Sequence, residues 1–131
     1  MKQGVVILHR NYEFGDGDSK DKWLVVLSPP KNGQVLVVKT TSQQRRRPLR
    51  DGCHPNTVES VYVFNANLGG FKKTTWVILE PIVLDAQKLA VSASVGAVKT
   101  LFTLGQIDIK ALVNCLRRCD DVSPFHLDLL A

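Results

Sequence analysis

Short apolar runs rich in β-branched residues, separated by turn signals, dominate the first two thirds of the chain. They occur at residues 5–8, 23–27, 35–41, 61–64 and 74–79. Such residues favour strands, and several short strands with turns every ~8–12 residues are typical of a small barrel or sandwich. The pattern therefore predicts a mostly β fold.

The dipeptide Asn32-Gly33 separates the second of these runs from the third. Asn-Gly is a strong signal for a two-residue hairpin turn. We therefore expect residues 23–27 and 35–41 to pair as a β-hairpin. Residues 82–84 follow Pro81, and we expect them to form a bent or edge strand because proline disfavours a central position in a sheet.

Helices are expected near the C-terminus. Apolar side chains recur at helical spacing over residues 108–119, which predicts a helix. Ser123-Pro124 is typical of a helix start and predicts a last short helix through residue 129. Residues 89–104 are ambiguous, and we expect a short strand near residues 98–103.

Length and composition indicate one domain. The chain has 131 residues, of which 44% are hydrophobic and 22% are charged. These ordinary values argue against disorder, collagen and coiled coil. We expect a single domain over residues 1–131, with a barrel over about residues 3–104 and a helical segment over about residues 106–130.

Several features favour a cytoplasmic protein. No apolar stretch approaches the ~20 residues that span a bilayer, and residues 1–5 lead into the first strand without a signal-peptide pattern. The three cysteines are an odd number, and their spacing does not resemble a disulfide framework. We therefore expect no membrane association and a reducing compartment.

The positive charge is confined to one segment. The net charge is +5, while residues 39–50 contain no acidic residue and five basic ones, Lys39, Arg45, Arg46, Arg47 and Arg50. Residues 42–58 also lack an apolar pattern, and a long loop is usually functional or disordered. The segment predicts one local site for a polyanion. The alternative is a solvated, mobile loop.

Four segments carry an ordered set of features. They are a glycine leading into an apolar strand (residues 4–8), an acidic glycine-rich loop leading into a strand that ends in Val-Leu-Ser (15–28), a strand that ends in Thr-Thr-Ser (37–42), and a late strand with the turn beyond it (74–89). In this order they resemble the MazF/PemK-like toxins, SH3-like barrels that act as endoribonucleases in toxin–antitoxin pairs.

The resemblance implies a fold and a set of partners. The fold is mostly β with C-terminal α, a small SH3-like β-barrel of five to seven strands plus one or two C-terminal helices. The implied partners are single-stranded RNA, an antitoxin peptide and a second copy of the chain in a homodimer. No cofactor is expected.

The resemblance also implies a catalytic pair. The family has an arginine at the start of strand two and a threonine or serine at the end of strand three, and Lys22 and Thr41 stand at these positions. Lys22 would stabilise phosphate charge without the bidentate fork of arginine. Thr41 would contact the scissile phosphate or help position the 2′-OH. Trp23 replaces the usual proline and Val5 the usual aspartate, so the chain resembles a divergent member.

Two other functions stay open. One is a non-catalytic SH3-like module that binds nucleic acid or protein, which the replacement of arginine by Lys22 favours. The other is a toxin-fold protein that inhibits a protein target such as gyrase. If RNA is bound, the residues expected to contact its backbone are Lys39, Arg45, Arg46, Arg47, Arg50, Lys72 and Lys73.

The aromatic residues allow two interpretations. Phe71 precedes Lys72 and Lys73, so it could stack on a base beside two phosphate contacts, or it could pack inward at a hairpin tip. We expect Trp23 and Trp76 in the core or at a dimer interface.

The cysteines do not form a convincing reactive or metal site. A zinc site built from Cys53, Cys115, Cys119 and a histidine would lack the tight cysteine pairs that such sites usually have. A nucleophilic pair of Cys53 with His54 would lack a third group to orient it. We therefore expect no metal site.

Overall fold

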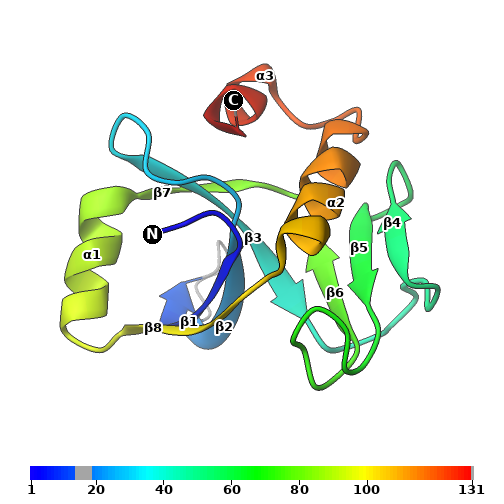
Figure 1. Cartoon of the computed structure of the whole chain (residues 1–131), viewed down its shortest axis with the longest axis horizontal. Helices are drawn as coiled ribbons and strands as arrows, with labels where there is room; N and C mark the ends of the chain where they lie inside the picture. The colour runs from blue at the N-terminus through cyan, green and yellow to red at the C-terminus, as the bar shows by residue number, and fades with distance from the viewer. Residues whose placement is uncertain (14–18, 131) are drawn as a thin grey trace.

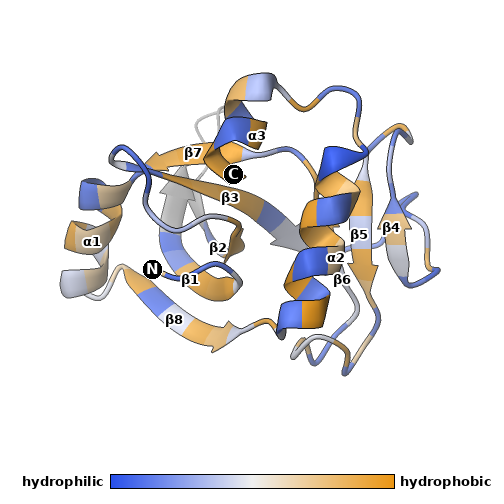
Figure 2. Ribbon diagram, turned by 45° about the horizontal axis from the view of Figure 1, so that its top comes forward, coloured by the Kyte–Doolittle hydropathy of each residue, from blue (hydrophilic) through white to orange (hydrophobic). Residues whose placement is uncertain are grey.

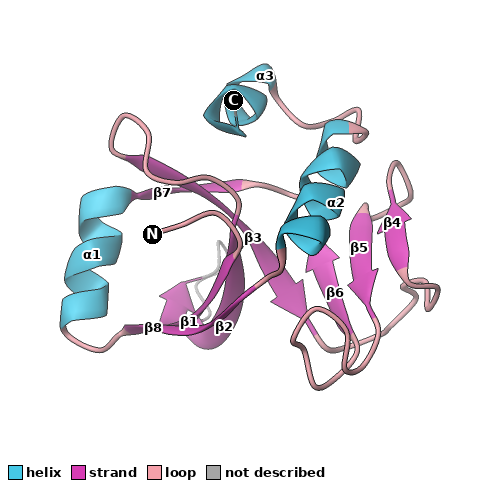
Figure 3. Ribbon diagram, in the orientation of Figure 1, coloured by secondary structure: helices cyan, strands magenta, loops and turns pink. Residues whose placement is uncertain are grey.

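The computed structural model describes residues 1–13 and 19–130, and within them the fold is mostly β with three helices (Figures 1 and 3). The strands are β1 (Val5–Glu13), β2 (Ser19–Val26), β3 (Gln34–Thr41), β4 (Gly52–His54), β5 (Val61–Phe64), β6 (Thr75–Ile78), β7 (Ile82–Asp85) and β8 (Val98–Thr103). The helices are α1 (Ala86–Ser94), α2 (Gln106–Arg117) and α3 (Pro124–Leu130).

All eight described strands belong to one antiparallel sheet, ordered β4-β5-β6-β3-β2-β1-β8, with β7 paired to β3 beside this path. The order ends at β4 and β8, and no described pairing joins these two strands. The sheet is therefore not closed, and the predicted five to seven strands are too few. The additional strand is β4, which is three residues long and lies within the predicted loop over residues 42–58.

The central strands are buried on both faces over residues 24–26 of β2 and 35–38 of β3. Val25 and Leu36 belong to a core that α2 and α3 cover, whereas Leu24 and Val35 belong to a second core that α1 covers. Successive side chains of a strand point to opposite faces. Their runs are therefore continuously apolar, and Figure 2 shows β3 hydrophobic along most of its length.

The strand β3 pairs on both edges. Its residues Val37 to Lys39 pair with β2 on one edge, while its first half pairs with β7 and its last residues, Thr40 and Thr41, pair with β6. It thereby connects the part of the sheet formed by β1, β2 and β8 to the part formed by β4, β5 and β6 (Figure 1).

The predicted hairpin is confirmed. Lys31 and Gln34 exchange backbone hydrogen bonds of 2.9 and 3.0 Å around the turn. Asn32 and Gly33 between them have φ angles of 53° and 75°. A two-residue turn with both central residues at positive φ matches the twist of the strands. The turn-rich loop predicted over residues 11–19 differs, since β1 extends to Glu13 and β2 begins at Ser19, and residues 14–18 lie outside the described part.

The two predicted C-terminal helices are confirmed as α2 and α3. Ser123 precedes α3, and its hydroxyl accepts a hydrogen bond of 3.2 Å from the His126 N–H. The helix α1 was not expected. Its N-cap is Asp85, whose carboxylate accepts a hydrogen bond of 2.9 Å from the Lys88 N–H. Leu89 is the one buried residue of α1. A helix that buries a single side chain needs no repeating apolar pattern, so the sequence contained no sign of it.

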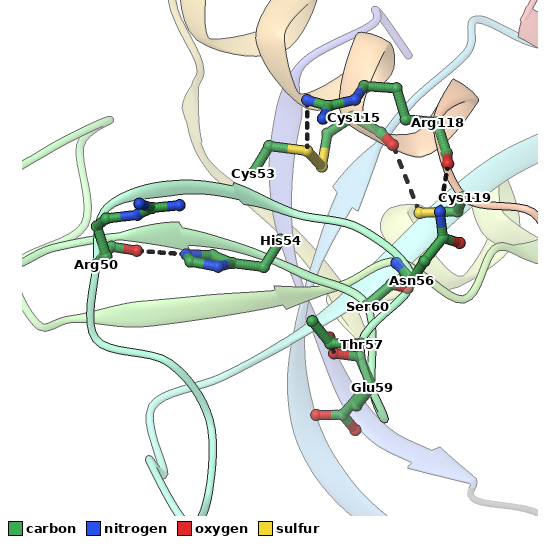
Figure 4. Close-up of a disulfide and its surroundings, with 10 residues drawn as sticks. All are labelled: Arg50, Cys53, His54, Asn56, Thr57, Glu59, Ser60, Cys115, Arg118 and Cys119. Atoms are coloured by element: carbon green, nitrogen blue, oxygen red, sulfur yellow. Dashed lines mark hydrogen bonds between the residues drawn. A yellow bond between two sulfur atoms is a disulfide. The ribbon is translucent and has the colours of Figure 1, made fainter.

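A disulfide joins Cys53 of β4 to Cys115 of α2 (Figure 4). The expectation that the cysteines form no disulfide is therefore wrong. The two residues are 62 positions apart, and the fold brings their Cα atoms to 5.6 Å. Asn56 strengthens the same connection, because its side chain donates to the Arg118 carbonyl at 2.9 Å and accepts from the Asp120 N–H at 2.8 Å.

Among the helices described, none is long and apolar enough to cross a membrane.

The disulfide is expected to stabilise the fold by constraining the unfolded chain. We predict that dithiothreitol lowers the free energy of unfolding of the wild type by about 2–4 kcal/mol. The variant Cys53→Ala should have this lower free energy of unfolding without reductant, and dithiothreitol should not change it further. Urea titrations followed by tryptophan fluorescence measure both effects. A wild type whose midpoint is the same in both conditions would contradict the prediction.

Candidate functional site

A hollow of about 670 Å³ lies where β2 begins beside the end of β3. We call it the Lys22 hollow. Its wall comes from four parts of the fold: the start of β2, the end of β3, the loop before β6, and β8. The lining residues are Asp21, Lys22, Trp23, Thr40, Thr41, Ser42, Gln43, Gly70, Phe71, Lys72, Lys73, Thr75, Leu101 and Phe102.

The two predicted catalytic residues therefore line the same hollow. Antiparallel pairing of β2 with β3 places Lys22 and Thr41 on neighbouring strands, and both line the hollow although the turn of the hairpin separates them in sequence. Both are partly buried. A partly buried ammonium group interacts with a phosphate more strongly than a fully solvated one does, because the local dielectric constant is lower.

The neighbouring threonines Thr40 and Thr41 have different environments. Thr40 is buried, and its hydroxyl donates to the Trp23 carbonyl at 3.0 Å. The Thr41 hydroxyl accepts a hydrogen bond of 3.2 Å from the Gln43 N–H. A hydroxyl that accepts through one lone pair still has its proton to donate. Thr41 is therefore the better hydrogen-bond donor toward a ligand in the Lys22 hollow.

Three lysines contribute positive charge to the lining. Lys72 and Lys73 are exposed and line the Lys22 hollow together with Lys22. Asp21 is the acidic residue of the same lining. Three lysines against one carboxylate make the lining positive, so its charge favours an anion.

Phe71, Trp76 and Trp23 differ in burial. Phe71 is only 1% exposed, so of the two predicted roles, packing inward or stacking on a base, the structure shows the inward packing. Trp76 is 3% exposed, and its indole N–H donates to the Pro48 carbonyl at 2.7 Å, which confirms a core position. Trp23 is 41% exposed and lines the hollow, so it is not a core residue, and the alternative place at a dimer interface stays a prediction.

Arg45, Arg46 and Arg47 line a second hollow of about 650 Å³, which we call the arginine hollow. Its lining residues are Arg45, Arg46, Arg47, Pro48, His54, Thr57, Val58 and Glu59. Arg47 forms an ion pair with Glu59, with 2.6 Å between Nε and Oε1. The basic residues of the predicted segment therefore do not share one site, because Lys39 and Arg50 line neither of the two hollows.

The two hollows are linked through Gln43. This residue lines the Lys22 hollow, and its carbonyl accepts a hydrogen bond of 2.8 Å from Arg47 Nη1. Arg45 and Arg46 are exposed beside it. An extended polyanion that occupies the Lys22 hollow could therefore continue along residues 42–46 toward the arginine hollow.

The sequence did not indicate Leu101 and Phe102 as site residues. They reach the Lys22 hollow from β8, which lies beside β1. Pairing between strands distant in sequence places them there, and no local pattern reports such pairing. Asp21 is the residue before Lys22, and this neighbouring position was the feature of the sequence that could have indicated Asp21 as a site residue.

The alternative cysteine sites are inconsistent with the structure. Cys53 and Cys115 form the disulfide and cannot supply thiolates to zinc or act as a nucleophile. His54 instead donates through Nε2 to the Arg50 carbonyl at 2.7 Å (Figure 4). In the described part of the chain, His, Cys, Asp and Glu side chains form no group of three or more that could hold a metal ion.

No protein-family model, curated protein or solved structure matches this chain.

Cys119 is the free cysteine of the described residues, and it is buried. Burial raises the pKa of its thiol above the ordinary value, and the Ser60 side chain opposes this only partly. A higher pKa lowers the thiolate fraction at a given pH, and the thiolate is the reactive form.

We predict that Cys119 in the folded, oxidised protein reacts with iodoacetamide at pH 8 at least about tenfold more slowly than an exposed thiol. Ala93→Cys, on the exposed side of α1, supplies that thiol as the matched control. Mass spectrometry of timed samples measures the rates, and unfolding in urea should remove the difference. Equal rates in the folded protein would refute the prediction.

Proposed function

We propose that the protein binds single-stranded RNA in the Lys22 hollow and cleaves it, as a divergent MazF/PemK-like endoribonuclease of a toxin–antitoxin pair. The observation that carries the proposal is that Lys22 and Thr41, from different strands, line one hollow with Lys72 and Lys73. A cationic lining with a hydroxyl donor and a carboxylate suits a phosphodiester.

Cleavage would proceed by attack of the ribose 2′-oxygen on the adjacent phosphorus. A bond forms between these atoms, the bond from phosphorus to the 5′-oxygen breaks, and a 2′,3′-cyclic phosphate results. Asp21 would accept the 2′-OH proton, and a proton from solvent would neutralise the leaving 5′-oxygen. Lys22 and the Thr41 hydroxyl would stabilise the charge that develops on the phosphate oxygens.

The geometry of Thr41 supports its role. Its oxygen already accepts a hydrogen bond from the Gln43 N–H, so its proton is available to a phosphate oxygen. The neighbouring Thr40 donates to the Trp23 carbonyl, which leaves Thr41 as the donor of the pair. Lys22 supplies a point charge in place of the fork of arginine.

The SH3-like barrel belongs to the same proposal. In it, β1, β2 and β3 with β6 and β7 form the barrel-like part, and β4 and β5 extend it. The pairing of β3 with β6 and β7 on one edge and β2 on the other supports this interpretation. The homodimer and the antitoxin peptide are further parts of the proposal.

Action on cellular RNA implies the cytoplasm, where thiols are kept reduced. The Lys22 hollow contains neither Cys53 nor Cys115, so RNA binding would not require the disulfide. The activity should therefore be assayed in both the oxidised and the reduced protein.

A second candidate function is RNA binding without cleavage. The lysine at position 22, where the family has arginine, favours it, because a point charge stabilises a phosphate transition state less completely than a bidentate fork does. Cleavage assays separate the two candidates.

We predict that Lys22→Ala and Thr41→Ala each lower the rate of cleavage of a mixed-sequence RNA by about 10²–10³-fold, as removal of a transition-state donor usually does. Lys22→Arg should retain activity. Lys110→Ala, an exposed lysine on α2, is the matched control and should leave the rate unchanged. Electrophoresis of a 5′-labelled RNA measures the rates. Protein that binds RNA without cutting it would favour the second candidate, and protein that neither binds nor cuts at low salt would refute both.

RNA that extends to the arginine hollow would contact Arg47, whose charge Glu59 partly compensates. We predict that Glu59→Gln raises the affinity for RNA at low salt by about two- to fivefold and steepens the dependence of log K on log salt by about 0.7. Glu80→Gln, at an exposed position outside both hollows, is the control. If Glu59→Gln and the wild type bind alike, RNA does not reach this hollow.

A further inference from the structure

Trp23 is an exposed aromatic ring in a hollow lined by cations. Its exposed fraction is 41%, whereas the next residue of the strand, Leu24, is fully buried. The ring lines the hollow beside Lys22. The ring therefore offers an apolar surface at the place where the lysines offer positive charge, and an aromatic ring beside cations suits a ligand with both a π-face and negative charge.

Two other aromatic rings lie close to that of Trp23. Its ring centroid lies 6.4 Å from that of Phe71 and 6.3 Å from that of Phe102, and Phe71 and Phe102 are 5.1 Å apart in an edge-to-face arrangement. Such contacts are favourable and restrict how the rings tilt. The indole is therefore held in place and does not need to be ordered when a ligand binds.

The backbone of Trp23 is also held. The residue pairs with Leu8 of β1, and its carbonyl accepts the hydrogen bond from the Thr40 hydroxyl. An aromatic ring on a central strand loses little entropy on binding, since both the strand and the ring are already ordered.

The neighbours of the ring define the ligand. The charges of Lys22, Lys72 and Lys73 favour an anion, and the exposed indole favours a flat apolar group in the same hollow. An RNA nucleotide has both parts, a phosphate and a base with a π-face. An acidic peptide would supply the charge, but it need not supply a planar ring.

We propose that Trp23 is a stacking platform for one base of single-stranded RNA, next to the phosphate held by Lys22. The inference rests on the proposed function, because it assumes that RNA occupies the Lys22 hollow. It assigns to that hollow a nucleotide subsite with a stacked base. A stacked base of this kind adds affinity with little dependence on which base it is.

Fluorescence tests the proposal, because stacking of a base on an indole quenches its emission. The probe is a 2′-O-methyl oligonucleotide of mixed sequence, which cannot undergo attack by a 2′-OH. Inorganic polyphosphate of equal charge is the probe without bases. We expect the oligonucleotide to quench the wild type and polyphosphate not to do so. Trp23→Phe should remove the quenching, because the remaining Trp76 is buried.

Affinity supplies a second measurement. Trp23→Ala should weaken binding of the oligonucleotide by roughly tenfold or more, while Trp23→Phe should retain most of the affinity because a ring remains. The salt dependence should be the same in both variants, because no phosphate contact is lost. Binding of polyphosphate should not change in either variant.

The two proposals fail in different ways. An oligonucleotide that binds without quenching, with equal affinity for the wild type and Trp23→Ala, would overturn the stacking platform and leave RNA binding intact. Absence of any oligonucleotide binding at low salt would overturn both. Equal weakening of oligonucleotide and polyphosphate binding by Trp23→Ala would show a loss of local structure and also refute the stacking role.

Discussion

Burial of residues 24–26 of β2 and 35–38 of β3 on both faces is the constraint on which the rest of this fold depends. Their side chains alternate between two hydrophobic cores, with Val25 and Leu36 in one and Leu24 and Val35 in the other. Apolar surface on both faces must be covered, because its exposure to water is costly. The helix α1 covers one face, and α2 with α3 covers the other. The helices therefore lie on opposite sides of the central strands (Figure 1).

The same arrangement creates the candidate site. The strand β3 exchanges one neighbour for another along its length, from β7 to β6. Its last residues, Thr40 and Thr41, line the Lys22 hollow together with residues 21–23 of β2, the loop before β6 and β8. Lys22 and Thr41 lie on the two strands of the hairpin. Trp23 follows Lys22 on β2, and its ring lies near those of Phe71 and Phe102.

The distribution of charge changes its meaning in three dimensions. The arginines that make residues 39–50 distinctive line the arginine hollow, where Arg47 pairs with Glu59. The lysines around Thr41 come from β2 and from the loop before β6, so the cationic lining near the proposed chemistry is drawn from separate segments. A run of basic residues in the sequence therefore does not locate the hollow that contains Lys22 and Thr41.

Local rules determined much of this protein from its sequence. The apolar runs, the turn at Asn32-Gly33 and the helix start at Ser123-Pro124 each depend on neighbouring residues, and the structure confirms the hairpin, the mostly β fold and both C-terminal helices. The hairpin and the family resemblance together predicted that Lys22 and Thr41 lie on adjacent strands, and in the structure both line the Lys22 hollow. Only the tertiary structure decided the disulfide between Cys53 and Cys115, the strand β4, the open sheet and the exposure of Trp23. The physical reason is that these features depend on contacts between segments far apart in the chain, which no short-range pattern of residue types reports.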